Sequence, residues 1–175
     1  MSDDARVPFG SLALYEQATQ EIYQRDYGDL VQMRQGRREF LAIRLGSECY
    51  GLDLRRVREV ARPAPITPVP FSPGWVLGVM ALRGGMVPVF HLGRLIGLPG
   101  TAAAVEPRAR VLMVARPENL VGLLVDEVLE VAAIPEEDLG PAPTDQQGGY
   151  ITGVARGQRS RILLLDHARL AGAGG

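Results

Sequence analysis

The chain contains no lysine, and all nineteen of its strongly basic residues are arginines. Enzymes that form a Schiff base and proteins that bind phosphate through a Walker loop both need a lysine, so both classes are excluded. The single cysteine, Cys49, excludes an intramolecular disulfide framework and is typical of a reducing compartment. We expect Cys49 to be a buried and chemically inert thiol.

Long apolar runs and an excess of one charge are also lacking. The run from Trp75 to Leu82 ends at Arg83, well short of the ~18 residues that a membrane-spanning helix requires. Asp3 and Asp4 stand where a secretory signal would carry positive charge. The net charge is −1, so no overall basic field attracts the chain to nucleic acid or anionic lipid. These features predict a cytoplasmic protein that does not insert into a membrane.

Residues that could form a catalytic or metal centre are scarce. His91 and His167 lie far apart in the sequence, with no second ligand at helical or hairpin spacing. No serine occupies a Gly-x-Ser-x-Gly elbow, and no glycine-rich phosphate loop precedes a helix. The acidic run at residues 136–138 is most simply a solvated loop. We therefore predict that the chain is not an enzyme and that it has no catalytic residue, no metal ion and no cofactor.

The strongest positive signal is an internal repeat. GLDLRRVREV (51–60) and GLLVDEVLEV (122–131) share Gly, Val, Glu and Val at identical spacing. Each copy is followed by a Gly-Val step, an Arg-Gly turn and an apolar run that ends in Arg-Leu. Two copies of this length do not form a repeat array, so we interpret them as two similar subdomains packed together. We expect function at the seam between them.

Strand patterns fill the chain from Glu39 onward. FLAIRL (40–45) alternates apolar and polar residues, as a half-buried strand does, whereas RRVREVARP (55–63) fits either a short helix or a continuing strand. WVLGVMAL (75–82) and MVPVFHL (86–92) predict a hairpin, joined by glycines that supply positive φ angles. Pro88 cannot donate a ladder hydrogen bond, so its strand is expected at an edge or with a bulge.

The second half, after a linker at residues 99–107, again consists of short strands separated by Gly/Pro turns. This pattern predicts a mainly β fold of small barrels or a sandwich. GRLIGL (93–98) is too short for more than one helical turn.

Residues 1–38 differ from the rest of the chain. Ser11 is a candidate N-cap, Tyr15, Ala18 and Ile22 recur at helical spacing, and Gly28 is a plausible stop. The apolar face is narrow, so we expect this helix to dock on a surface rather than stand alone. Two roles fit: covering its own domain, or binding a separate partner.

Three segments have now to be considered together: VREV (57–60), GVMALRGGMVPVFHL (78–92) and GLLVDEVLEV (122–131). In this order they resemble the CheW family of chemotaxis coupling proteins, and the resemblance runs from Glu39 to Leu170. It implies two five-stranded SH3-like β-barrel subdomains that share a core over residues 39–171. Residues 1–38 then form a helical N-terminal extension, and residues 172–175 form a flexible tail.

The resemblance also implies a function. Members of this family have no catalytic activity and join the regulatory domain of a CheA-like histidine kinase to the cytoplasmic tip of methyl-accepting chemoreceptors. The chain is then a signal-transduction adaptor, recruited from the cytoplasm to membrane-associated or polar receptor arrays.

The positions of this chain that match the family's contact segments, or the residues supporting them, are Val57, Glu59, Gly78, Arg83, Gly84, Val125, Asp126 and Val128. Apolar grooves lined by valine accept the faces of a helical receptor hairpin. Arg83 could form a forked pair with a carboxylate, and Glu59 is the candidate partner. Each of these residues could instead have a purely structural role. The ion pair could only join two segments, the valines could pack in the core, and the glycines could be required by the backbone conformation.

The chain departs from the family pattern in two places. His91 replaces the aspartate that usually follows the Pro-Val strand, whereas the second copy keeps Asp166. We expect His91 to be a satisfied surface or capping residue. The long extension fits a specialised scaffold for a gliding, pilus or polar-localisation system without direct receptor coupling. A small-barrel nucleic-acid binder is a further alternative, although the family resemblance predicts no nucleic-acid partner.

Overall fold

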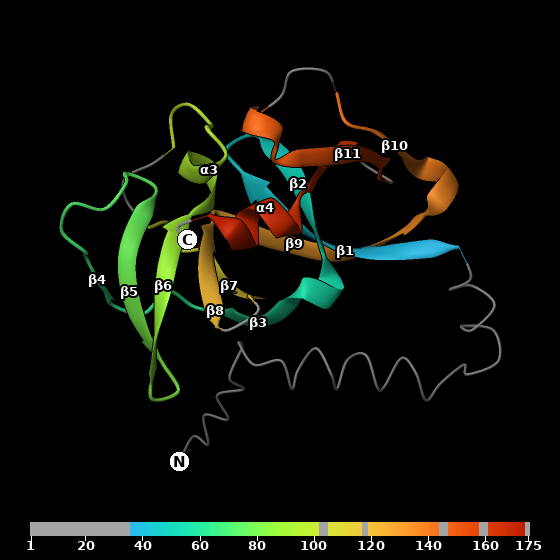
Figure 1. The fold of residues 1–175 in the computed structure, drawn as a ribbon. Helices are drawn as coiled ribbons and strands as arrows, with labels where there is room; N and C mark the ends of the chain where they lie inside the picture. Colours follow the sequence, from blue (N-terminus) through green and yellow to red (C-terminus); the bar gives the residue numbers. More distant parts are fainter. Residues whose placement is uncertain (1–35, 102–104, 117–118, 144–146, 158–160, 174–175) are drawn as a thin grey trace, which may run out of the picture.

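The computed structural model describes residues 36–101, 105–116, 119–143, 147–157 and 161–173, which form two β-sheets and a few short helices (Figure 1). The predicted N-terminal helix lies outside these residues. The first strand starts at Arg37, two residues before the expected domain boundary at Glu39. The last helix runs to Gly172, one residue beyond the expected domain end.

The first repeat supplies six strands: β1 (Arg37–Leu45), β2 (Glu48–Asp53), β3 (Val57–Ala61), β4 (Ile66–Thr67), β5 (Val76–Leu82) and β6 (Gly85–His91). The second repeat supplies their counterparts: β7 (Arg110–Ala115), β8 (Leu120–Val125), β9 (Glu127–Pro135), β10 (Leu139–Pro141), β11 (Ile151–Arg156) and β12 (Arg161–Leu165). The helices are α3 (Leu92–Leu95), α4 (His167–Gly172) and the 3₁₀ turns η1 (Leu54–Arg56), η2 (Glu136–Asp138) and η3 (Gln147–Gly149). Residues 54–61 thus combine both structures that the sequence allowed there, a helical turn followed by a strand.

Each sheet combines strands from both repeats. The strand orders are β10-β11-β12-β2-β1-β9 and β3-β7-β8-β6-β5-β4. The two sheets are equivalent: if each strand of the first sheet is replaced by its counterpart in the other repeat, the order of the second sheet results, read from its other end. After β2 the chain crosses over, so β3 pairs with β7; after β8 it crosses back, so β9 pairs with β1. The linker therefore does not separate two self-contained halves. The short β4 and β10 bring each sheet to six strands instead of five.

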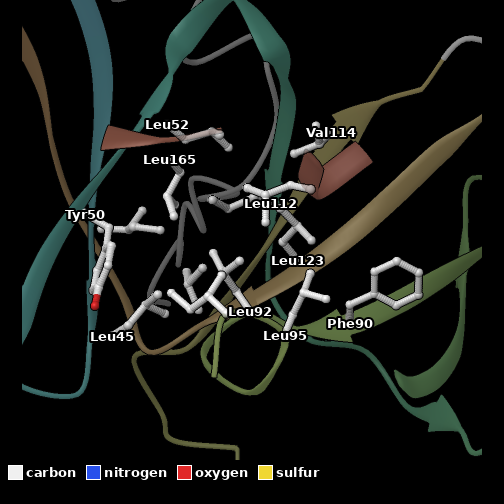
Figure 2. Close-up of a cluster of buried hydrophobic side chains, with 14 of the residues drawn as sticks. Leu45, Tyr50, Leu52, Phe90, Leu92, Leu95, Leu112, Val114, Leu123 and Leu165 are labelled. Atoms are coloured by element: carbon white, nitrogen blue, oxygen red, sulfur yellow. The ribbon is translucent and has the colours of Figure 1, made fainter. Parts of the chain in front are cut away.

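Three apolar clusters fill this arrangement. One cluster lies within each sheet's own lobe, and the half-buried Cys49 packs against one of them. The largest cluster joins the two sheets, because Tyr50 and Leu165 come from one sheet while Phe90, Leu112 and Leu123 come from the other (Figure 2). Each such side chain contributes about 1.5–3 kcal/mol when it is fully buried. The predicted mainly β fold with a shared core is confirmed.

The hairpin between β5 and β6 has a two-residue turn. Arg83 and Gly84 adopt φ angles of 49° and 80°, as a type I′ turn requires at both central positions. The sequence indicated a left-handed conformation only for the glycines, so the left-handed conformation of Arg83 was not predicted.

Of the two expected settings for Pro88, the edge is wrong, because β6 lies between β5 and β8, whereas the β5–β6 pairing does have a register shift, between Val76 and Gly78. Pro88 is tolerated in β6 because the pairing of β6 with β8 starts only at Val89.

The two repeats end in matched helical caps. The Asp166 side chain accepts a hydrogen bond from the Arg169 backbone N–H at 3.1 Å and caps α4. His91 caps α3 in the same way, with its Nδ1 accepting from the Arg94 backbone N–H at 3.5 Å. His91 is only 5% exposed. The capping role is therefore confirmed, whereas a surface position for this histidine is wrong.

Candidate functional site

Arg83 and Glu59 form the ion pair that the sequence predicted. Glu59 lies on β3 and Arg83 in the β5–β6 turn, and their side chains approach to 3.1 Å. Arg83 is 66% exposed, whereas Glu59 is 13% exposed. Because solvent screens an exposed guanidinium, we expect the pair to stabilise the fold by only about 0–1 kcal/mol. Its more distinctive property is that a half-buried carboxylate fixes the direction of an exposed arginine.

The two predicted site glycines serve the backbone. Gly78 has a φ angle of 142°, and a Cβ atom there would lie 2.6 Å from the carbonyl carbon of Thr67 on β4. Gly84 has a φ angle of 80°, and a Cβ atom there would meet no atom within 4 Å. Gly78 is therefore required by close packing and conformation together, and Gly84 by conformation alone.

The three predicted site valines differ in their accessibility. Val125, on β8, is completely buried in the core that the two sheets share. Val57 and Val128 are half-buried and pack against the same core from the starts of β3 and β9. Val125 is thus a packing residue, whereas Val57 and Val128 remain partly accessible to a partner at the two points where the chain crosses between sheets.

Asp126 fixes the second crossing, between β8 and β9. Its Oδ2 accepts a 2.6 Å hydrogen bond from the backbone N–H of Gly46, in the β1–β2 turn. Because Gly46 has a φ angle of 60°, a side chain would strain this turn. The predicted residues therefore form two groups: Glu59 and Arg83 meet beside β3, whereas Asp126 and Val128 lie at the β8–β9 crossing.

Glu127 carries an ion-pair network that sequence reasoning did not assign. Its Oε2 accepts from Nε and Nη2 of Arg44 at 3.1 and 2.7 Å, and its Oε1 accepts from Arg108 at 3.2 Å. The forked hydrogen bond from Arg44 is the main reason why the pKa of Glu127 lies below its usual value. In the sequence Glu127 is one of three neighbouring acids, with Asp126 and Glu130. No local pattern connects it with an arginine 83 positions away.

Asp53 has a similar environment at the first crossing, between β2 and β3. It caps η1 by accepting the Arg55 backbone N–H at 3.0 Å, and its carboxylate also accepts two hydrogen bonds from the Arg55 guanidinium. Chiefly through those side-chain bonds, Arg55 lowers the pKa of Asp53. Both crossings therefore have a carboxylate held by arginine.

Glu127→Gln is expected to lose stability at neutral pH and to match the parent chain in acid. A lowered pKa means that the carboxylate stabilises the fold above its unfolded-state pKa, ~4.3, and that this contribution disappears as the pH falls through the lower folded value. Urea unfolding at a series of pH values measures the difference. Glu130→Gln, at an exposed position of the same strand, is the matched control. If the difference in free energy of unfolding between Glu127→Gln and the parent chain does not change with pH, this assignment is wrong.

A cavity of about 650 Å³ opens beside the second crossing. Its walls are the β1–β2 turn, the segment that follows α3, and residues near Arg108. Asp126 is the one predicted site residue that lines it. Among the residues that the structure describes, no group of three His, Cys, Asp or Glu side chains could hold a metal ion. No helix within those residues is both long and apolar enough to cross a membrane.

Comparison with known proteins agrees with this architecture. The family described as CheW-like domain matches residues 39–174. The chemotaxis protein CheW of Rhizobium meliloti is 33% identical over 136 residues, which cover 75% of this chain and 85% of that protein. Protein FrzA of Myxococcus xanthus is 32% identical over 75% of this chain and 84% of its own length.

A solved structure shows the same fold. The crystal structure of the scaffolding protein TtCheW from Thermoanaerobacter tengcongensis superimposes with a TM-score of 0.69 at 28% sequence identity. The match covers 74% of this chain and 89% of that one. Two exchanged sheets around one core, and a family match that spans both repeats, lead to the same conclusion: the chain belongs to the CheW family.

Proposed function

We propose that this chain is a non-enzymatic adaptor that couples chemoreceptors to a CheA-like histidine kinase. The observation that carries the proposal is the family match over residues 39–174, which includes both repeats and both crossings. Relatives named chemotaxis protein CheW, similar over three-quarters of the chain, support the same function. The adaptor acts in the cytoplasm and is recruited to receptor arrays.

In this proposal the first group of predicted residues, Glu59 and Arg83, contacts the receptor through the tip of the β5–β6 hairpin. Arg83 projects from the type I′ turn, and the exposed Met86 lies three residues further along the same hairpin. A thioether adapts to the irregular surface of a helix, and a guanidinium forks to a carboxylate. This combination suits an amphipathic helix that carries an acidic residue beside its apolar face.

The second group supplies another contact at the β8–β9 crossing. Val128 is half-buried at the start of β9, and Asp126 holds the neighbouring turn in place through Gly46. Val57 occupies the matching position at the start of β3. Partly exposed valines on a rigid scaffold form shallow apolar surfaces that suit a helix face or a sister barrel.

Co-purification tests the proposal directly. The chain is expected to retain the regulatory domain of a CheA-like kinase and the cytoplasmic tip of a chemoreceptor from the same organism, each in a separate experiment. A mostly apolar interface should keep its affinity as salt rises, whereas nucleic-acid affinity should fall by orders of magnitude. Failure to bind the kinase domain would overturn the proposal, and salt-sensitive binding to DNA or RNA would replace it.

The alternative is a scaffold that binds its kinase without a receptor. The similarity to protein FrzA, which is not named as a chemotaxis protein, favours keeping this alternative. Under it, the kinase domain is retained and the receptor tip is not. The two experiments above therefore decide between a coupling protein and a receptor-independent scaffold.

A further inference from the structure

Strand β9 exposes apolar side chains at positions where the first repeat carries arginine. The aligned repeats place Leu129, Val131 and Ala133 where the first repeat has Arg58, Val60 and Arg62. Leu129 and Val131 are 46% and 40% exposed, and Ala133 is exposed as well. Arginine is the residue type expected on an open edge strand, since charge there prevents unwanted pairing. The replacement of arginine by leucine and alanine on β9 indicates a surface that is normally covered.

The described part of the chain begins next to this strand. β9 is the edge strand of its sheet, with β1 as its neighbour. The chain enters β1 at Arg37, which lies opposite Pro135 at the end of β9. A hydrogen bond of 2.8 Å from the Glu136 N–H to the Gly36 carbonyl holds that entry in place. The point at which residues 1–35 join the domain, Gly36, therefore lies beside the end of β9, whereas β7, the neighbour of β3, is preceded by the linker between the repeats.

We propose that the helix predicted at residues 12–27 docks on Leu129, Val131 and Ala133. Val131 lies four residues before Pro135, so the apolar face begins within about 15 Å of the chain entry. Residues 28–35 can span up to about 26 Å, which is enough to place the helix alongside the strand. The apolar positions Tyr15, Ala18 and Ile22 form a stripe that suits a surface only one strand wide.

Disulfide trapping in the full-length chain tests the docking. In a Cys49→Ser background, Ile22→Cys is paired with Leu129→Cys; the control pairs Gln24→Cys, on the opposite face of the helix, with the same strand cysteine. We expect the first pair to form an intramolecular disulfide at least about tenfold faster than the control, because docking raises the local concentration of one thiol. Equal rates, or no disulfide in either variant, would overturn the proposal. Mainly intermolecular disulfides would assign the face to a second copy and would also overturn it.

A second measurement does not depend on the introduced cysteines. The double variant Leu129→Arg with Ala133→Arg introduces the arginines that the first repeat has at positions 58 and 62, and it is expected to release the helix. Amide exchange within residues 12–27 should then accelerate at least about tenfold, while the domain itself keeps its protection. Glu130→Arg, which places an arginine at the exposed position between them, should leave this exchange unchanged. Unchanged exchange in the double variant would show that another surface, or none, holds the extension.

Discussion

Gly78→Ala is expected to lower the free energy of unfolding by about 3 kcal/mol or more. Its φ angle of 142° is one that residues with a side chain rarely adopt. The new Cβ atom would also lie 2.6 Å from the Thr67 carbonyl carbon and 2.9 Å from the Pro68 Cα atom. Both are backbone atoms, and β4 could move away only by breaking the pairing of Thr67 with Val79. Backbone strain and the loss of the β4–β5 pairing therefore both lower the free energy of unfolding.

Urea unfolding measures this loss through the fluorescence of Trp75, the only tryptophan in the chain. Its ring packs edge-on against Phe90, with centroids 4.9 Å apart, so it reports on the core shared by the sheets. Gly84→Ala is the matched control, because it imposes a left-handed alanine in open space and should cost only about 1–2 kcal/mol. A loss at Gly78 no larger than at Gly84 would show that β4 moves away without penalty.

Arg83→Glu is expected to reduce receptor-dependent kinase activation at least about tenfold, equivalent to 1.4 kcal/mol of coupling free energy. The variant places two carboxylates side by side, because Glu59 is fixed on β3. An acidic group on the receptor helix would then face repulsion in place of a forked hydrogen bond. Since Arg83 is exposed and its pair contributes little, the free energy of unfolding should fall by no more than about 1 kcal/mol. Reconstitution with kinase and receptor fragment measures the activation.

A charge-swapped variant separates the two possible roles of Arg83. Arg83→Glu combined with Glu59→Arg rebuilds the ion pair in the opposite sense. If Arg83 contacts the receptor, the double variant recovers stability but not activation. Recovery of activation would show that Arg83 only positions the hairpin through Glu59. Normal activation by a folded Arg83→Glu single variant would eliminate either role.

Much of the fold followed from the repeat and the strand pattern. The matched segments identified two equivalent subdomains, and the pairing of Glu59 with Arg83 was proposed, by their opposite charges, for two residues that the family resemblance singled out. The exchange of strands between the sheets could not be predicted, because a repeat shows which segments are equivalent but does not show which of them pair. The pairing of β1 with β9 joins residues such as Leu41 and Val131, far apart in the sequence.

The candidate site was predicted less completely than the fold. Periodicity marks a valine as apolar, but it cannot distinguish the fully buried Val125 from the half-buried Val128 three residues later. The Arg44–Glu127 pair was missed for a related reason, because it joins a turn-flanking arginine to a strand in the other repeat. His91 was predicted only in part, because the sequence left a surface position and a capping role open, and the structure shows the cap at a buried position.

The crossing of β3 and β9 has a mechanical consequence. Two lobes joined by one linker can swing like a hinge, whereas here the chain passes between the two sheets twice, from β2 to β3 and from β8 to β9. Moving the sheets apart would require both short connections to open, with loss of the core between the sheets. The angle and spacing between the two lobes are therefore fixed. The two lobes move as one body, and a displacement of one lobe carries the other with it.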